Sequence, residues 1–160
     1  MGSGSAFGDL ERPARQVVRR GGFVLACEAS RALPFFTPEG ERCWVDGWDP
    51  RPAFPGATAV EFTTGSVFRL EHEGERSLWT VVEAAPQLGL ADYVYVVEGS
   101  RLVRVRVEVS AAGPASSQIA VTYSVTSLSE DGDRFLDGFT QEVYAAKMQD
   151  WRRRIEACLR

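Results

Sequence analysis

The segment that most constrains the fold of this chain is RLVRVRVEVS, residues 101–110, because its side chains alternate strictly between apolar and charged from Val103 to Val109. The apolar positions after Arg101 and Leu102 are Val103, Val105, Val107 and Val109. The charged positions between them are Arg104, Arg106 and Glu108. Successive side chains of a β-strand point to opposite faces of a sheet, so this pattern predicts a strand with one buried and one solvated face. The buried face must be covered by another element.

Neighbouring segments predict further strands of the same sheet. β-rich runs bounded by turn residues occupy 65–74, 76–85, 90–99 and 117–128. Because the connections between them are short, we expect consecutive antiparallel hairpins. The run FVLACEA predicts an additional first strand at about 22–30, and the glycine pair before it is expected to interrupt the chain.

The C-terminal segment is the part of the sequence long enough to cover this sheet, and it predicts one long helix from about 131 to 159. Its apolar residues recur at helical spacing. They are Phe135, Phe139, Val143 and Ala146, followed by Trp151, Ile155 and Cys158. The stripe shifts around the helix after Ala146, which predicts a bend or a new packing partner there. The expected organisation is a flexible tail at 1–15 and a single α+β domain at 16–160.

The segment FFTPEGERCWVDGWDP, residues 35–50, places four large aromatic side chains among turn residues. Thr37 and Pro38 predict the start of a short helix, and Gly47 predicts its end. A helix of about two turns is not stable without packing, so its aromatic residues must be buried against the rest of the domain. Trp44 and Trp48 are interpreted first as core anchors.

Composition and charge exclude several classes of function. A formal net charge of −4 argues against a phosphate-binding surface, so we expect no nucleic-acid partner. Three cysteines, far apart and without a CxxC pair, predict neither a disulfide nor a zinc site, and a reducing cytoplasm is the simpler location. No apolar run approaches the ~20 residues of a membrane span, so no integral membrane association is expected. We predict no cofactor and no metal.

Three segments carry a resemblance to a known family. They are F-x-P-E-G-E-R-x-W-V-x-G-W-D-P at 36–50, the strand opening at 65–68, and Tyr-Ser-Val-Thr-Ser-Leu-Ser at 123–129. In this order they resemble the START-like helix-grip superfamily, in particular bacterial SRPBCC proteins related to polyketide cyclases, over residues 16–160. The resemblance implies a curved antiparallel sheet of six to seven strands around a long C-terminal helix, with two short helices after the first strand. It also implies a cavity that takes lipids, sterols or polyketides.

The residues that such a cavity would offer to a ligand are aromatic with one exception. They are Phe35, Phe36, Glu41, Trp44, Trp79, Tyr93, Tyr123, Phe135 and Phe139. Each has a structural alternative. The tryptophans and phenylalanines can simply complete the core, the tyrosines can be ordinary strand residues with surface hydroxyls, and Glu41 can cap its short helix together with Glu39 and Arg42.

No catalytic residue is predicted from the sequence. His72 is the single histidine, and its place beside Gly74 predicts a solvated hairpin tip. Arg104 and Arg106 are interpreted as a solvated sheet face. The leading hypothesis is a protein that binds a small hydrophobic or amphipathic molecule in the cavity. One alternative is a polyketide cyclase or dehydratase that uses Tyr93, Tyr123, His72 or Glu41 for proton transfer. The other is a module that binds a protein partner, although no sequence motif indicates such a partner.

Overall fold

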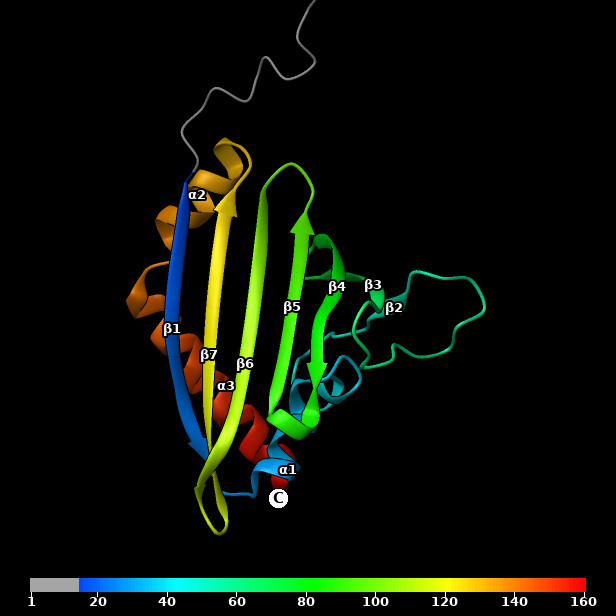
Figure 1. The fold of residues 1–160 in the computed structure, drawn as a ribbon. Helices are drawn as coiled ribbons and strands as arrows, with labels where there is room; N and C mark the ends of the chain where they lie inside the picture. The colour runs from blue at the N-terminus through cyan, green and yellow to red at the C-terminus, as the bar shows by residue number, and fades with distance from the viewer. Residues whose placement is uncertain (1–14) are drawn as a thin grey trace, which may run out of the picture.

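The computed structural model describes residues 15–160, which form a seven-stranded antiparallel sheet in the order β1-β7-β6-β5-β4-β3-β2 (Figure 1). The strands are β1 (Gln16–Leu25), β2 (Arg51–Pro52), β3 (Val67–His72), β4 (Glu75–Ala85), β5 (Leu90–Val97), β6 (Arg101–Gly113) and β7 (Ser116–Ser127). Consecutive strands from β3 to β7 pair with one another, which confirms the predicted series of hairpins. β1 closes the other edge by pairing with β7.

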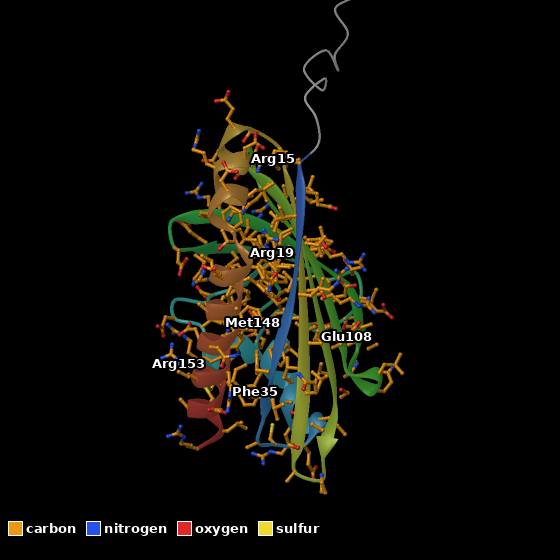
Figure 2. The ribbon with its side chains drawn as sticks, turned by 90° about the vertical axis from the view of Figure 1, so that its left-hand side faces the viewer. Arg15, Arg19, Phe35, Glu108, Met148 and Arg153 are labelled. Carbon is orange, nitrogen blue, oxygen red and sulfur yellow. A yellow bond between two sulfur atoms is a disulfide. The ribbon has the colours of Figure 1, made fainter. Side chains whose placement is uncertain are left out.

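Helices cover one face of this sheet. The two main ones are α2 (Glu130–Gly138) and α3 (Gln141–Leu159), and the short ones are α1 (Ala29–Ala32) and the 3₁₀ turns η1 (Leu33–Phe36), η2 (Gly40–Cys43) and η3 (Pro86–Leu88). Figure 2 shows Met148 on the side of α3 that faces the sheet and Glu108 on the far side of the sheet. The four valines of β6 are 0% to 6% exposed, so the alternation in this strand has the predicted orientation.

The first strand is longer than the sequence predicts and begins before the glycine pair. β1 pairs with β7 without interruption from Gln16 opposite Thr126 to Leu25 opposite Ser117. Gly22 lies against the backbone of β7, where an added Cβ would come within 1.9 Å of the Ile119 carbonyl oxygen. The glycine therefore allows a close approach between two strands, and the predicted break at this point was wrong.

The C-terminal segment forms two helices instead of one. The chain leaves α2 at Phe139, and the Thr140 side chain accepts a hydrogen bond from the Val143 amide at 3.2 Å, which starts a new helix. α3 then continues through Ala146 to Leu159, so the interruption of the helical segment lies at Phe139. The buried residues of α3 are Tyr144, Met148 and Ile155, whereas Val143 is 51% exposed.

The insertion at 35–50 contains one turn of 3₁₀ helix, η2, in place of the predicted two-turn helix. Thr37 lies between η1 and η2, where its hydroxyl donates to the Pro34 carbonyl and accepts from the Gly40 amide. Gly40 packs so closely on Pro34 that a Cβ would lie 1.7 Å from the Pro34 oxygen. This tight reversal leaves no room for an α-helix that begins at Thr37.

Two of the three cysteines form a disulfide, which corrects the prediction of unpaired thiols. Cys43 at the end of η2 is bonded to Cys158 at the end of α3, across a separation of 115 residues. Cys27 is free and buried. The expectation of a reducing cytoplasm was based on the absence of a cysteine spacing typical of disulfides. Because a disulfide is present, this argument no longer supports that expectation.

The outer face of the sheet is not simply solvated, as was predicted for Arg104 and Arg106, because these arginines pair with a buried carboxylate. Asp92 on β5 is fully buried, and its carboxylate accepts hydrogen bonds from Arg104 at 2.6 and 3.1 Å and from Arg106 at 3.2 Å. The two arginines are half-exposed, and they cover this carboxylate.

The predicted tail at 1–15 lies outside the described residues except for Arg15, whose guanidinium donates to Asp137 at 2.8 Å. Among the residues that the structure describes, no helix combines the length and the apolar character needed to cross a membrane.

Candidate functional site

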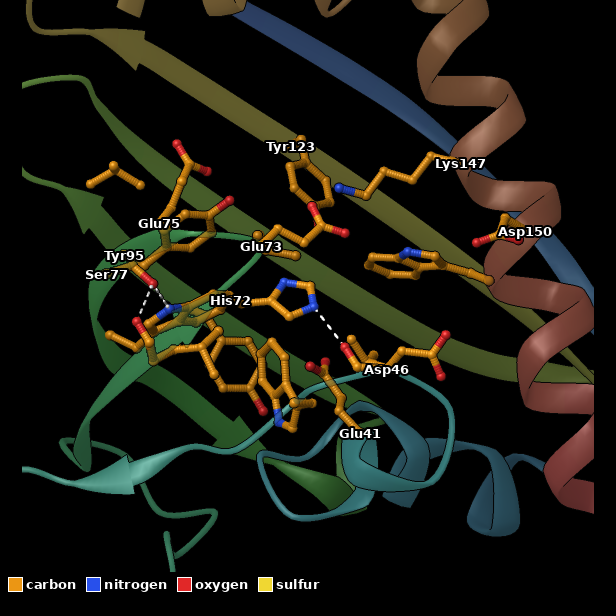
Figure 3. Close-up of a pocket in the computed structure, with 18 of the residues that line it drawn as sticks. Glu41, Asp46, His72, Glu73, Glu75, Ser77, Tyr95, Tyr123, Lys147 and Asp150 are labelled. Atoms are coloured by element: carbon orange, nitrogen blue, oxygen red, sulfur yellow. Dashed lines mark hydrogen bonds between the residues drawn. The ribbon is translucent and has the colours of Figure 1, made fainter.

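A cavity of about 600 Å³ lies between the inner face of the sheet, α3 and the segment that follows η2 (Figure 3). Its floor includes Val105 and Val107 of β6, whose small side chains face the helices. Its wall on the helix side is formed by Lys147 and Trp151 of α3. A volume of this order is typical of sites for small organic ligands, roughly 300 to 1,000 Å³.

The cavity walls combine aromatic with charged side chains and include every tryptophan of the chain. These are Trp44, Trp48, Trp79 and Trp151, and they are joined by Tyr93, Tyr95, Tyr123 and Phe135. Trp79 stacks on Tyr95 with ring centroids 4.0 Å apart, and Trp44 meets Trp151 edge to face at 5.1 Å. Such contacts hold the rings in fixed positions.

The indole nitrogens of three of these tryptophans are already bonded to the protein. Trp44 donates to the Phe35 carbonyl at 2.8 Å, and Trp48 donates to the Pro38 carbonyl at 2.8 Å. Trp79 donates to the Ser77 hydroxyl at 2.7 Å. Their rings therefore present apolar faces to the cavity, while other side chains must supply its polar contacts.

The segment 41–48, which we call the lid, closes one end of the cavity and is tied down by polar bonds. Arg42 bridges Glu39 at 2.6 Å and Asp49 at 2.9 Å. Asp46 accepts from Arg154 of α3 at 2.8 Å, next to the disulfide that joins the same two elements. Glu39 and Arg42 therefore form an ion pair, whereas the N-cap of η2 receives no side-chain hydrogen bond.

Glu41 differs from its neighbours in the lid because its carboxyl lines the cavity. Burial raises the pKa of Glu41 to about 8, and the positive charge of Lys147 opposes this shift only in part. The carboxyl is therefore largely protonated near neutral pH, so it can donate a hydrogen bond to a ligand.

Replacement of Glu41 by Gln is expected to change how stability depends on pH. Because the folded pKa is raised, the folded state keeps a proton that the unfolded state loses, and stability falls as pH rises from about 4.5 to about 8. We expect Glu41→Gln to remove a loss in the free energy of unfolding on the order of 3 kcal/mol between pH 5 and pH 8. Urea unfolding at the two pH values measures this difference. The solvated carboxyl of Glu71 provides the control variant Glu71→Gln, and equal pH dependence in wild type and Glu41→Gln would contradict the assignment.

Arg101 is a cavity residue that sequence reasoning missed. Its side chain is 6% exposed, and its guanidinium donates to both carboxylate oxygens of Glu75, at 2.7 and 2.9 Å. It also lies 3.8 Å above the ring of Phe135. These hydrogen bonds lower the pKa of Glu75. Strand parity could have revealed Arg101, since it shares the inner face of β6 with the valines.

Lys147 is the second cationic residue that the sequence analysis did not single out. It lies three residues after Tyr144 and four before Trp151, on the inner face of α3. Burial lowers the pKa of its amine, against the raising influence of Glu73 and Glu41. The signal in the sequence is that this is the only lysine of the chain.

The two predicted tyrosines both line the cavity but differ in what their hydroxyls do. Tyr93 donates to the Phe36 carbonyl at 2.7 Å, so this hydroxyl supports the fold. Tyr123 makes no hydrogen bond through its hydroxyl within residues 15–160, and burial raises its pKa well above the ordinary value. The Tyr123 hydroxyl is therefore available to a ligand.

His72 is less exposed than its hairpin position predicts. The tip of the hairpin is formed by Glu73 and Gly74, both with positive φ, while His72 precedes it as a half-buried residue of the cavity wall. Its Nε2 lies 2.9 Å from the Asp46 carbonyl oxygen, and its ring meets Trp48 edge to face. The structure thus places this imidazole between the lid and the cavity.

Three of the predicted ligand contacts lie outside the cavity lining. Phe36 is fully buried between Trp44 and Trp151, and Phe139 is packed among Phe135, Tyr123 and Tyr144. Phe35 is half-buried against the core. The remaining six candidates line the cavity: Glu41, Trp44, Trp79, Tyr93, Tyr123 and Phe135.

Several solved structures resemble this one at low sequence identity. A protein of Helicobacter pylori has a TM-score of 0.66 and 12% identity, with 90% of this chain and 88% of that chain covered. Norcoclaurine synthase from Thalictrum flavum, in complex with dopamine and hydroxybenzaldehyde, has a TM-score of 0.61 and 12% identity, over 88% and 86%. A protein of Rhizobium leguminosarum has a TM-score of 0.61 and 15% identity, over 92% and 96%. No family model matches the sequence, and a search of curated proteins found no match. At these identities the similarity shows a shared fold and no more.

Proposed function

We propose that this chain, which has the START-like helix-grip fold, binds a small amphipathic molecule in the cavity between its sheet and α3. The observation that carries the proposal is the cavity of about 600 Å³ with aromatic walls that include all four tryptophans. Burial of an apolar ligand surface against such rings supplies affinity. The resemblance to polyketide cyclase-related proteins leads us to favour an aromatic, polyketide-like ligand over a long acyl chain.

Polar side chains in the same cavity would orient this ligand. The protonated Glu41 carboxyl can donate a hydrogen bond, and the Tyr123 hydroxyl can donate or accept one. Arg101 and Glu75 neutralise each other at the end of the sheet, so they offer a polar surface without net charge. This combination suits a ligand with an aromatic body and hydroxyl or carbonyl groups.

The comparison with norcoclaurine synthase supports the size and character of this ligand class. That protein is described in complex with dopamine and hydroxybenzaldehyde, which are both small aromatic molecules with polar groups. The present cavity has room for molecules of this kind.

A second candidate function is a cyclase or dehydratase that acts on a polyketide-like ligand in the same cavity. The observation in its favour is that Glu41, His72, Tyr93 and Tyr123 all line the cavity. A Glu41 carboxyl that is largely protonated at neutral pH is suited to general acid catalysis. Mass spectrometry of a bound polyketide analogue distinguishes the two functions, because turnover changes its mass or retention and binding alone does not.

Ligand binding is expected to quench or shift the intrinsic tryptophan fluorescence, because all four emitting side chains line the cavity. Titration with hydroxylated naphthalenes and flavonoids, combined with thermal shift, measures this effect. The variant Val105→Phe places a ring inside the cavity and should weaken binding about tenfold or more. Leu102→Phe on the same strand points to the outer face and is the matched control. The proposal fails when no compound of the series changes either fluorescence or melting temperature.

A further inference from the structure

Lys147 combines a unique place in the sequence with an unusual place in the fold. It is the only lysine among the 18 lysine and arginine residues of the chain, and it is half-buried in the cavity wall. Figure 3 shows its side chain reaching from α3 into the cavity toward Tyr123. Its Nζ lies 4.6 Å from the centroid of the Tyr123 ring and 5.7 Å from that of Trp151.

The amine of Lys147 has no polar partner within residues 15–160. Among these residues, neither a hydrogen bond nor an ion pair joins Nζ to another side chain. The three arginines of α3, in contrast, each hold a carboxylate at 2.8 to 3.0 Å. Burial of an ammonium group without a paired carboxylate costs free energy, because the charge loses its hydration. An amine in this position therefore favours its neutral form.

The charged groups that face Lys147 come from three other elements. Glu73 approaches from the β3–β4 turn and Glu41 from the lid, and the ionised form of each carboxyl favours the ammonium form of Lys147. Arg101 on β6 opposes it, and burial is the largest influence. The balance lowers the pKa of Lys147, which increases the fraction of amine with a free electron pair at neutral pH.

We propose that Lys147 Nζ is a nucleophilic amine that forms an imine with an aldehyde or ketone group of an aromatic or apolar molecule in the cavity. This inference rests on the proposed binding function, because the ligand must first enter the cavity. The aromatic rings around Nζ would hold the apolar body of such a molecule, and no competing lysine is present elsewhere in the chain.

The chemical step is balanced without an oxidant or a reductant. The Nζ electron pair attacks the carbonyl carbon and forms a C–N bond, while the carbonyl oxygen takes a proton and becomes a hydroxyl. The nitrogen then loses a proton, the hydroxyl is protonated and leaves as water, and a C=N double bond forms. The protonated Glu41 carboxyl is a proton source within the same cavity.

Reductive trapping tests the inference directly. The protein is incubated at pH 7 with 2-naphthaldehyde and sodium cyanoborohydride, and modified peptides are located by mass spectrometry. We expect the alkylated amine at Lys147, formed about tenfold or more faster than at a solvated lysine. Lys147→Arg keeps a cation on α3 but cannot form the imine, so it should lose this product.

The matched control moves the lysine to solvent on the same helix. The double variant Lys147→Arg, Arg153→Lys carries its lysine where the side chain is 75% exposed. The α-amino group of the chain reacts in every sample, so it provides an internal rate reference that does not depend on any variant being folded.

The outcomes separate this inference from the binding function on which it rests. Quenching of tryptophan fluorescence by the aldehyde, together with rapid trapping at Lys147, supports both. Quenching with trapping no faster than in the double variant overturns the imine proposal and leaves the binding function intact. Neither quenching nor trapping overturns both.

Discussion

Loss of the Cys43–Cys158 disulfide is expected to lower the free energy of unfolding by about 3 to 5 kcal/mol. The bond closes a loop of 115 residues, and the entropy that a cross-link removes from the unfolded chain grows with loop length. It joins the lid to the end of α3, so its loss should also weaken ligand binding in the cavity between them.

Urea unfolding with and without dithiothreitol measures this effect, with the double variant Cys43→Ser, Cys158→Ser as control. Reductant should destabilise the wild type and leave the double variant unchanged. Thiol titration of the denatured protein should find one free thiol, from Cys27, before reduction and three afterwards. Three free thiols in protein purified without reductant, or a melting temperature insensitive to dithiothreitol, would contradict the prediction.

The second large effect is expected on the outer face of the sheet. Replacement of both Arg104 and Arg106 by Met should destabilise the fold by about 3 to 5 kcal/mol, because it leaves a buried carboxylate without its positive partners. Asp92 is fully buried, and within residues 15–160 its carboxylate accepts hydrogen bonds only from these two guanidinium groups. Methionine keeps the apolar stems that cover the carboxylate, so water cannot easily replace the lost bonds.

A third substitution tests the cause of this loss. Asp92→Asn, added to the double methionine variant, removes the buried charge and should restore part of the stability. Arg76→Met is the control for the loss of an exposed arginine, since that side chain is 85% exposed and lies 3.8 Å from Glu71. It should change stability by less than about 0.5 kcal/mol. A double methionine variant as stable as Arg76→Met would show that the Asp92 pairing contributes nothing.

Much of the architecture could be predicted from local patterns. The α+β helix-grip class, the hairpins from β3 to β7 and the buried valine face of β6 are confirmed. These features depend on side-chain period and on turn residues, which neighbouring positions in the sequence determine. Six of the nine predicted ligand contacts line the cavity, because the alternation along a strand also determines which aromatic residues face inward.

The errors arose where a distant segment changes what a local signal means. Gly22 signals a break by itself, but its position against Ile119 on β7 makes it the residue that lets two strands approach. Arg104 and Arg106 alternate like solvated residues, but a buried aspartate on the neighbouring strand turns them into its partners. The place of His72 next to a hairpin turn predicts a solvated side chain, but the Asp46 carbonyl of the lid lies within hydrogen-bond distance of its ring.

The sequence by itself determined the hairpins from β3 to β7, the face that β6 buries and the need for a covering helix, because period and turn chemistry are local. Only the tertiary structure decided that Cys43 meets Cys158, that Glu41 turns inward, and that Arg101 and Lys147 line one cavity with all four tryptophans. These residues come from separate elements, and their protonation depends on how completely the packed chain excludes water from them.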